Sequence, residues 1–194
     1  MFFETEQPDM AVTLVQHLLT VEDYHKMGEV GILPEGKRVE LIAGKIINMS
    51  PIGSSHAACV DNILALFNRI APEDRLIRGQ NPIILDDHSE PEPDVAVLRY
   101  RADRYASGHP KAEDVLFVLE VSGSSLAYDE EVKLPLYAAA GIPAYCMVNL
   151  KDNTIALHTI PEGEQYKKRE LFAAEDRLPV GALRTEVKAS DMLV

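Results

Sequence analysis

The feature that most constrains this fold is a pair of acidic residues, Asp94 and Glu120, each in or beside an apolar run of strand type. Asp94 opens the run 95–98, and Glu120 lies inside the run 115–121. A carboxylate within a run typical of buried sheet is costly unless another group pairs with it. We therefore expect two neighbouring strands whose carboxylates lie close enough to share one cation.

The next basic residue along the chain, Lys133, lies on a helix predicted over residues 126–140. Two carboxylates on neighbouring strands can hold a hard cation through oxygen ligands, and a lysine ammonium group can position or activate water beside it. The pattern therefore predicts a phosphodiesterase dependent on Mg²⁺ or Mn²⁺, with Asp94 and Glu120 as metal ligands and Lys133 as the third catalytic residue.

Each of these residues also has a purely structural interpretation. Asp94 could be an ordinary residue at the start of a strand, and Glu120 could form a salt bridge with a core arginine. Lys133 could be an exposed lysine that pairs with Asp129 or Glu130 on its own helix. If the two carboxylates do meet, one should have a raised pKa, and Asp94→Asn should leave the metal-free fold equally or more stable.

Three further polar residues occupy positions where they could support such a site. Glu40 lies between Val39 and Leu41, in a strand pattern like that of Glu120. His56 opens a helix, where an imidazole could bind phosphate or metal or could simply be exposed. Gln80 could orient a neighbouring group through its amide or could be a polar residue at a strand edge.

The chain as a whole predicts a single α/β domain over residues 1–194, with a mixed sheet flanked by helices and a loose tail at residues 1–12. Pro135 should kink or loosen the last helix, unless it marks that helix's first turn. Helices are expected over 20–27, from 54 or 55 to 70, and over 126–140. Strands are expected over 38–42, 45–49, 76–85, 94–99, 115–121, 145–148 and 154–158, with a further edge strand at 169–172.

Composition favours a globular protein without a membrane segment. Of the 194 residues, 46% are hydrophobic and 26% charged, which suits a soluble domain with a substantial core. No apolar run reaches membrane-spanning length, and the first residues have neither the basic nor the apolar segment of a signal peptide. Cys59 and Cys146 lie among apolar neighbours, so we expect reduced, buried thiols in a cytoplasmic protein.

The net charge of −12 argues against a general nucleic-acid coat, whose affinity would come from clustered lysine and arginine. It does not exclude a nuclease, because a metal site needs carboxylates and basic residues can gather on one face. Basic residues do gather in two stretches: Arg69, Arg75 and Arg78, and then Arg99, Arg101, Arg104 and Lys111. The alternative interpretation is that these residues lie in solvated loops.

Other chemistries lack their sequence signatures. The two cysteines are far apart and no two histidines are four residues apart, so no local zinc motif is present. Residues 123–125 lack the Gly-Lys-Ser pattern of a phosphate-binding loop, and no Gly-x-Ser-x-Gly elbow of a serine hydrolase occurs.

An ordered set of short motifs resembles one known family. The motifs are Arg-Val-Glu-Leu-Ile-Ala-Gly at 38–44, Met-Ser-Pro at 49–51 followed by His56, Ser-Glu-Pro-Glu-Pro-Asp-Val-Ala at 89–96, Leu-Glu-Val-Ser at 119–122, Lys-Leu-Pro-Leu-Tyr at 133–137 and Gly-Ile-Pro-Ala-Tyr at 141–145. Over residues 20–160 the chain is similar to the Uma-type restriction endonucleases, a family of the PD-(D/E)XK nuclease superfamily that is common in cyanobacteria.

The resemblance implies a restriction-endonuclease-like core, with Asp94 and Glu120 as metal ligands. It also implies supporting roles for Glu40, His56, Gln80 and Lys133. The chain departs from the superfamily pattern at Ser122, where a lysine is expected two residues after the second carboxylate, so Lys133 is a relocated equivalent. It also carries Cys146 where similar sequences commonly have tryptophan, a position we assign to packing.

We therefore predict a Mg²⁺- or Mn²⁺-dependent endonuclease that hydrolyses DNA. A homodimer is expected, because cutting both strands of a duplex favours twofold symmetry. Two alternatives stay open: a catalytically silent relative that serves as a binding or assembly module, and a nuclease that acts on RNA or single strands.

Overall fold

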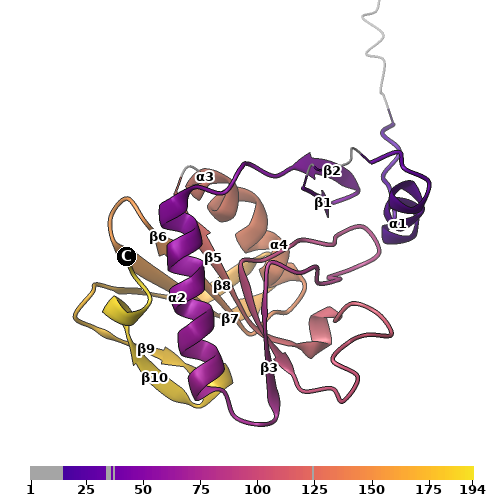
Figure 1. Cartoon of the computed structure of the whole chain (residues 1–194). Helices are drawn as coiled ribbons and strands as arrows, with labels where there is room; N and C mark the ends of the chain where they lie inside the picture. The colour runs from indigo at the N-terminus through magenta and orange to yellow at the C-terminus, as the bar shows by residue number, and fades with distance from the viewer. Residues whose placement is uncertain (1–14, 34–35, 37, 124) are drawn as a thin grey trace, which may run out of the picture.

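The computed structural model describes residues 15–33, 36, 38–123 and 125–194, and the tail expected over residues 1–12 lies outside the described residues. Figure 1 shows an open sheet with helices packed against it. In chain order the elements are α1 (Val21–Glu29), β1 (Val39–Ile42), β2 (Lys45–Asn48), α2 (Ser54–Ile70), β3 (Arg75–Gly79), β4 (Val95–Arg99), η1 (Ala112–Asp114), β5 (Val115–Ser122), α3 (Leu126–Tyr128), η2 (Asp129–Lys133), α4 (Leu134–Ala139), β6 (Ala144–Asn149), β7 (Thr154–Glu162), β8 (Gln165–Phe172), β9 (Arg177–Val180), η3 (Gly181–Leu183), β10 (Thr185–Lys188) and η4 (Ala189–Asp191).

The main sheet has six strands in the order β3-β4-β5-β6-β7-β8. Its neighbouring strands are antiparallel except for β5 and β6, which are parallel. A parallel pair needs a crossover connection, and the helical segment from α3 to α4 supplies it. The mixed sheet predicted from the sequence is therefore confirmed, and β8 is one of its two edge strands.

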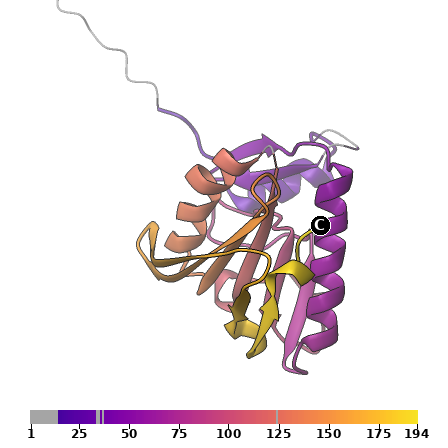
Figure 2. The same cartoon turned by 90° about the vertical axis from the view of Figure 1, so that its left-hand side faces the viewer.

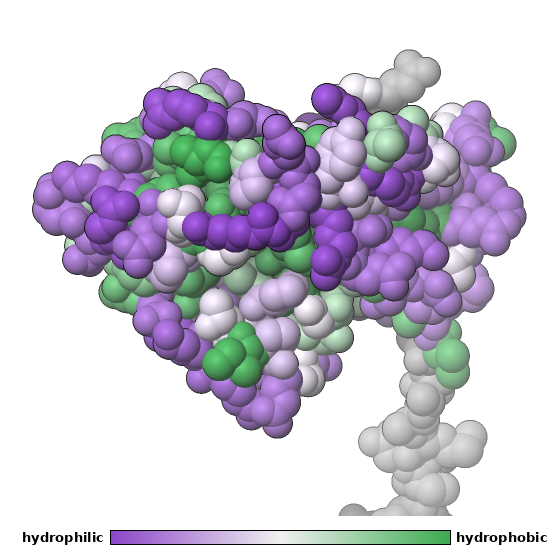
Figure 3. All heavy atoms as spheres, turned by 90° about the horizontal axis from the view of Figure 1, so that it is seen from below, coloured by the Kyte–Doolittle hydropathy of each residue, from purple (hydrophilic) through white to green (hydrophobic). Residues whose placement is uncertain are grey.

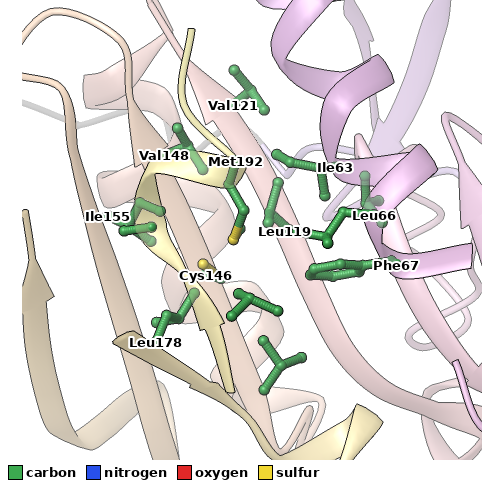
Figure 4. Packing of buried hydrophobic residues seen from close by; sticks show 14 of the residues in the cluster. Ile63, Leu66, Phe67, Leu119, Val121, Cys146, Val148, Ile155, Leu178 and Met192 are labelled. Atoms are coloured by element: carbon green, nitrogen blue, oxygen red, sulfur yellow. The ribbon is translucent and has the colours of Figure 1, made fainter. Parts of the chain in front are cut away.

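Helices cover both faces of this sheet (Figure 2). On one face α2 packs its apolar side, with Ile63 and Phe67 fully buried, against β4 and β5. The β9–β10 hairpin adds Leu178 to the same core, as Figure 4 shows. On the other face α4 places Tyr137 against Tyr145 of β6, with ring centroids 5.2 Å apart.

Both cysteines are buried free thiols, as expected. Cys146 lies in the core between β6 and α2, where burial raises the pKa of its thiol, and Cys59 lies on α2. Their surroundings are apolar, so packing accounts for their positions. None of the helices in the described part of the chain combines the length and the apolar character needed to cross a membrane.

The N-terminal segments lie beside the main sheet. Thr20 caps α1 by a reciprocal exchange of hydrogen bonds with Asp23, and no residue of α1 is buried. The predicted hairpin is present as β1 and β2, and its turn at Ala43 and Gly44 has positive φ angles of 48° and 73°. Gly44 is required here, because a Cβ atom at this position would lie 2.5 Å from Leu18 Cβ.

Three sequence predictions need correction. The strand expected over residues 76–85 ends at Gly79, since Gln80 has a φ of +51° and turns the chain away from β4. The helix expected over residues 126–140 is interrupted by the π-helical turn η2, directly before Pro135 in the first turn of α4. Proline cannot donate the next backbone hydrogen bond, so a regular helix cannot run through this point.

The third correction concerns the C-terminal region, which the sequence analysis left without strands after residue 172. The β9–β10 hairpin forms there because Leu178, Val180 and Val187 alternate with more exposed residues and bury their side chains in the core. Figure 3, a view from below, shows a mainly hydrophilic surface with smaller hydrophobic areas.

Phe67→Ala is expected to lower the free energy of unfolding by about 3–5 kcal/mol, because it opens a cavity where the ring now meets Phe117 edge to face. Chemical denaturation followed by circular dichroism measures this change. Tyr100→Ala, at a side chain that is 51% exposed, serves as the control and should change stability by about 0.5 kcal/mol or less. A small effect of Phe67→Ala would contradict the position of the core.

Candidate active site

Asp94 and Glu120 lie side by side at the same end of two adjacent strands. Val95 pairs with Leu119 in the antiparallel β4–β5 ladder, so the preceding Asp94 lies opposite Glu120. The amide N–H of Val121 donates to Asp94 Oδ2 at 2.9 Å, and the amide N–H of Asp94 donates to Glu120 Oε2 at 3.2 Å. The backbone of each strand thus holds the carboxylate of the other, and both residues are buried.

The end of β3 fixes the second oxygen of Asp94. The backbone N–H of Gln80 bonds to the carbonyls of Pro93 and Asp94, both at 3.1 Å. The side-chain amide of Gln80 then donates to Asp94 Oδ1 at 3.2 Å. The positive φ that ends β3 at Gln80 therefore also points an amide at the carboxylate.

His56, in the first turn of α2, contacts Asp94 from the other side. Its Nε2 lies 2.9 Å from Asp94 Oδ2, and this hydrogen bond raises the pKa of the imidazole. Burial raises the pKa of Asp94, but the hydrogen bonds from His56, Val121 and Gln80 outweigh burial and hold the pKa of Asp94 below its usual value. His56 Nδ1 is buried and has no hydrogen-bond partner among the described residues, so a water molecule or a phosphate oxygen would satisfy it.

Lys133 is buried, and its side chain points at the acidic pair. Its Nζ lies 3.0 Å from Glu120 Oε1 and 3.6 Å from Glu40 Oε2. The alternative of an exposed lysine paired with Asp129 or Glu130 is therefore wrong, as is the alternative of an arginine partner for Glu120. Tyr137 also donates to Glu120 Oε1 at 2.9 Å, so two side chains of the crossover segment hold this carboxylate.

Glu40, on β1, holds Lys133 from the far side. The hydroxyl of Tyr128 donates to Glu40 Oε1 at 3.2 Å, and the backbone N–H of Glu92 donates to Glu40 Oε2 at 3.2 Å. The Glu40 side chain is 3% exposed, so it is fixed within the site. Glu40 can therefore set the position of the Lys133 ammonium group.

Asp129 is a fourth buried carboxylate of this site, which the sequence analysis treated only as a surface partner of Lys133. Its Oδ2 accepts hydrogen bonds from Ser122 at 2.7 Å and from Ser125 at 2.8 Å. Burial raises the pKa of Asp129. Its spacing of four residues from both Ser125 and Lys133, which places these side chains on one face of a helix, was the sequence signal for this position.

The site carries more acid than base. Four carboxylates (Asp94, Glu120, Glu40 and Asp129) surround Lys133 and His56. Burial raises the pKa of Glu120 to about 8; the Lys133 ammonium opposes this shift, and the Asp94 carboxylate adds to it. A divalent cation would offset the excess negative charge, and oxygen donors suit Mg²⁺ or Mn²⁺ better than softer metals. The residues present therefore fit the metal that the family resemblance implies.

These residues line a cleft of about 620 Å³ between β1–β2, the start of α2 and the α3–η2 segment. Asp94, Glu120, Lys133, Glu40 and His56 all line it, and Gln80 reaches it through its bond to Asp94. The two basic stretches noted in the sequence do not line it. Besides Lys133 and His56, the cleft is lined by one other basic residue, Arg38, which pairs with Glu92 at 2.8 Å.

The protein has a six-stranded mixed sheet with helices on both faces, and its acidic pair lies at one end of the adjacent strands β4 and β5. This arrangement is a restriction-endonuclease-like fold. Residues 21–190 match the model of the Uma2 family, described as "Putative restriction endonuclease". The chain therefore belongs to the Uma2 family, which confirms the resemblance seen in the sequence and supports a nuclease function.

A solved structure gives the same result for the fold. The crystal structure of a "putative nuclease belonging to DUF820" from Anabaena variabilis ATCC 29413 superposes with a TM-score of 0.68 at 17% sequence identity. The match covers 90% of this chain and 97% of that chain. A search of curated proteins found no match.

Proposed function

We propose that this protein is a Mg²⁺- or Mn²⁺-dependent endonuclease that hydrolyses DNA phosphodiester bonds at a PD-(D/E)XK-type site. The observation that supports the proposal most is the meeting of Asp94 and Glu120 on adjacent strands, with the Lys133 ammonium 3.0 Å from Glu120. Asp94 and Glu120 would hold the metal. When bound, the metal would polarise the scissile phosphate and lower the pKa of a water ligand.

Lys133 supplies the positive charge that Ser122 cannot supply at the usual superfamily position. Its ammonium group would stabilise the attacking hydroxide or the charge that develops on the phosphate. Glu40 holds this group in place, while His56 and Gln80 orient Asp94 through hydrogen bonds to its two oxygens. Orienting partners of this kind commonly affect metal affinity by about 10–100-fold.

The N-terminus of α2 is the part of the cleft best suited to a phosphate group. Gly53 is its N-cap residue and provides no side-chain cap, and Gly53, Ser54 and Ser55 line the cleft. The free backbone N–H groups at the start of a 17-residue helix attract anions through hydrogen bonds and the helix dipole. A backbone phosphate can therefore approach between α2 and the acidic pair.

Double-stranded DNA is the substrate we favour, and a homodimer would place two clefts on its two strands. The reduced thiols at Cys59 and Cys146 agree with a cytoplasmic enzyme.

The test is cleavage of supercoiled plasmid and of labelled single-stranded and double-stranded oligonucleotides, DNA and RNA, with Mg²⁺, Mn²⁺ or EDTA. We expect metal-dependent cutting of duplex DNA that Glu120→Gln abolishes and that Lys168→Ala, at an exposed lysine of β8, leaves unchanged. Cutting of RNA or single strands alone would overturn the choice of substrate. Metal binding without cleavage of any nucleic acid would favour the silent binding module.

A further inference from the structure

A second group of metal-ligating side chains lies outside the cleft. It consists of His25 on α1, Glu90 in the loop between β3 and β4, and His109 in the loop between β4 and β5. One ligand atom of each residue lies within 4.8 Å of the ligand atoms of the other two. His25 Nε2 is 2.8 Å from Glu90 Oε2, and the two imidazole rings have centroids 6.0 Å apart.

This geometry is close to that of a tetrahedral zinc site. Zinc binds histidine nitrogen and carboxylate oxygen at about 2.0–2.2 Å, which places neighbouring ligand atoms about 3.4 Å apart. In this cluster the His25 Nε2–Glu90 Oε2 distance is 2.8 Å, which is shorter than that spacing, and no two ligand atoms are more than 4.8 Å apart. Small side-chain shifts would therefore bring two nitrogens and one oxygen around a single ion.

The buried carboxylate of Glu90 favours a cation in this cluster. Its side chain is 3% exposed, and a buried carboxylate is costly without a partner. Among the described residues its ion pair is with His25, whose side chain is 42% exposed and which is a cation only while protonated. A bound metal ion would supply the compensating charge without that proton.

The cluster also joins three segments that are distant in the sequence. Helix α1 buries no residue of its own. Hydrogen bonds hold it to the rest of the protein: the Val21 N–H donates to the Asp87 carbonyl at 2.8 Å, and the Tyr24 hydroxyl donates to the Val39 carbonyl at 2.8 Å. Figure 1 shows α1 at the side of the molecule, away from the six-stranded sheet. A metal shared by His25, Glu90 and His109 would cross-link this helix to the two loops.

We propose that His25, Glu90 and His109 bind a Zn²⁺ ion that fastens α1 to the body of the protein, with the fourth ligand position open to water. Two imidazoles and one carboxylate favour zinc, whereas the oxygen donors of the cleft favour Mg²⁺. The two sites therefore take different metals and are independent of each other. The sequence analysis found no zinc motif because these three ligands are brought together only by the fold.

The test is isothermal titration of metal-free full-length protein with ZnCl₂, in a Glu120→Gln background that removes one ligand of the cleft. We expect one zinc ion per chain, and at least a tenfold loss of affinity in the double variant His25→Ala/His109→Ala. His17→Ala, at another exposed histidine, is the matched control and should bind zinc normally. Co²⁺ in place of zinc should give the intense visible absorption of a tetrahedral site, and the double variant should lose it.

Amide hydrogen exchange shows whether the metal fastens α1. Zinc should slow exchange across α1 in the wild-type protein and leave it unchanged in the double variant. Equal zinc affinity in the wild type and the double variant would overturn the site, whatever the outcome of the cleavage assays. Zinc binding by the cluster without slower exchange in α1 would overturn the fastening role.

Discussion

Lys133→Ala is expected to reduce metal-dependent cleavage by about 10²–10³-fold, because it removes the positive charge beside the acidic pair. It should also lower the free energy of unfolding of the metal-free protein by about 3 kcal/mol, since Glu40 then loses its buried cation and Glu120 loses a hydrogen-bond donor. Loss of a lysine exposed on its helix, the alternative left open by the sequence, would leave folding nearly unaffected. The burial of Lys133 changes that expectation.

Single-turnover cleavage at saturating Mg²⁺ separates these two effects, with Mg²⁺ binding measured by calorimetry and stability by denaturation. Ser122→Ala is the matched control within the site: it removes a hydroxyl bonded to Asp129 but no charge, so cleavage should fall far less. Lys133→Arg keeps the charge and should retain more stability than Lys133→Ala. If Lys133→Ala cut DNA at the wild-type rate, the relocated lysine would have no catalytic role.

The second large effect is expected from Glu120 and should depend on pH. The pKa of Glu120 is raised from 4.5 to about 8 by burial, so between these values the folded metal-free protein holds a proton that the unfolded chain has lost. The stabilisation from Glu120 is complete below pH 4.5 and is lost as the pH rises through about 8. Over this window it should fall by up to about 1.4 kcal/mol per pH unit.

Glu120→Gln should remove this pH dependence, because the amide stays neutral throughout. Near pH 8 the metal-free variant should equal or exceed the wild type in stability, but Mg²⁺ should no longer stabilise it. For the wild type, Mg²⁺ at 100 times its Kd should add about 2.7 kcal/mol. Thermal melts at several pH values, with and without Mg²⁺, measure all three quantities.

Glu164→Gln, at an exposed turn, serves as the control and should behave like the wild type. A Mg²⁺ response that survives Glu120→Gln would assign the metal elsewhere. The sequence alone suggested that Asp94→Asn would leave the metal-free fold equally or more stable. The hydrogen bonds from His56, Val121 and Gln80 favour ionised Asp94, so Asp94→Asn should destabilise the metal-free fold.

The sequence predicted the central part of the fold because the signals there are local and strong. The apolar runs around Asp94 and Glu120 became β4 and β5, and the helical spacing of Ile63 and Phe67 became the buried side of α2. The order of these elements then places both carboxylates at one end of the sheet. Strands β9 and β10 were missed because each has four residues, in a region rich in charged side chains.

The remaining parts of the site depend on features that sequence patterns do not encode directly. The spacing of Asp129 and Lys133 places them on one helix face, but the sequence pattern does not show that this polar face is buried against the sheet. The approach of His25, Glu90 and His109 depends on how two loops fold beside α1. Such contacts follow from tertiary packing, which a single sequence specifies but a local pattern does not reveal.

Because of the turn η2, the geometry of this site depends on the length of the segment as well as on its residues. A π-helical turn holds about one residue more than an α-helical turn, so removing one residue between Asp129 and Lys133 would convert the wide turn into regular helix and shorten the spacing of these two side chains from four residues to three. Asp129 and Lys133 would still share a helix face, but they would lie about 60° apart around the helix axis, and the approach of the Lys133 ammonium to Glu120 Oε1, now 3.0 Å, would change. Relatives that keep every acidic and basic residue but differ in length here would retain the composition of the site while losing its geometry.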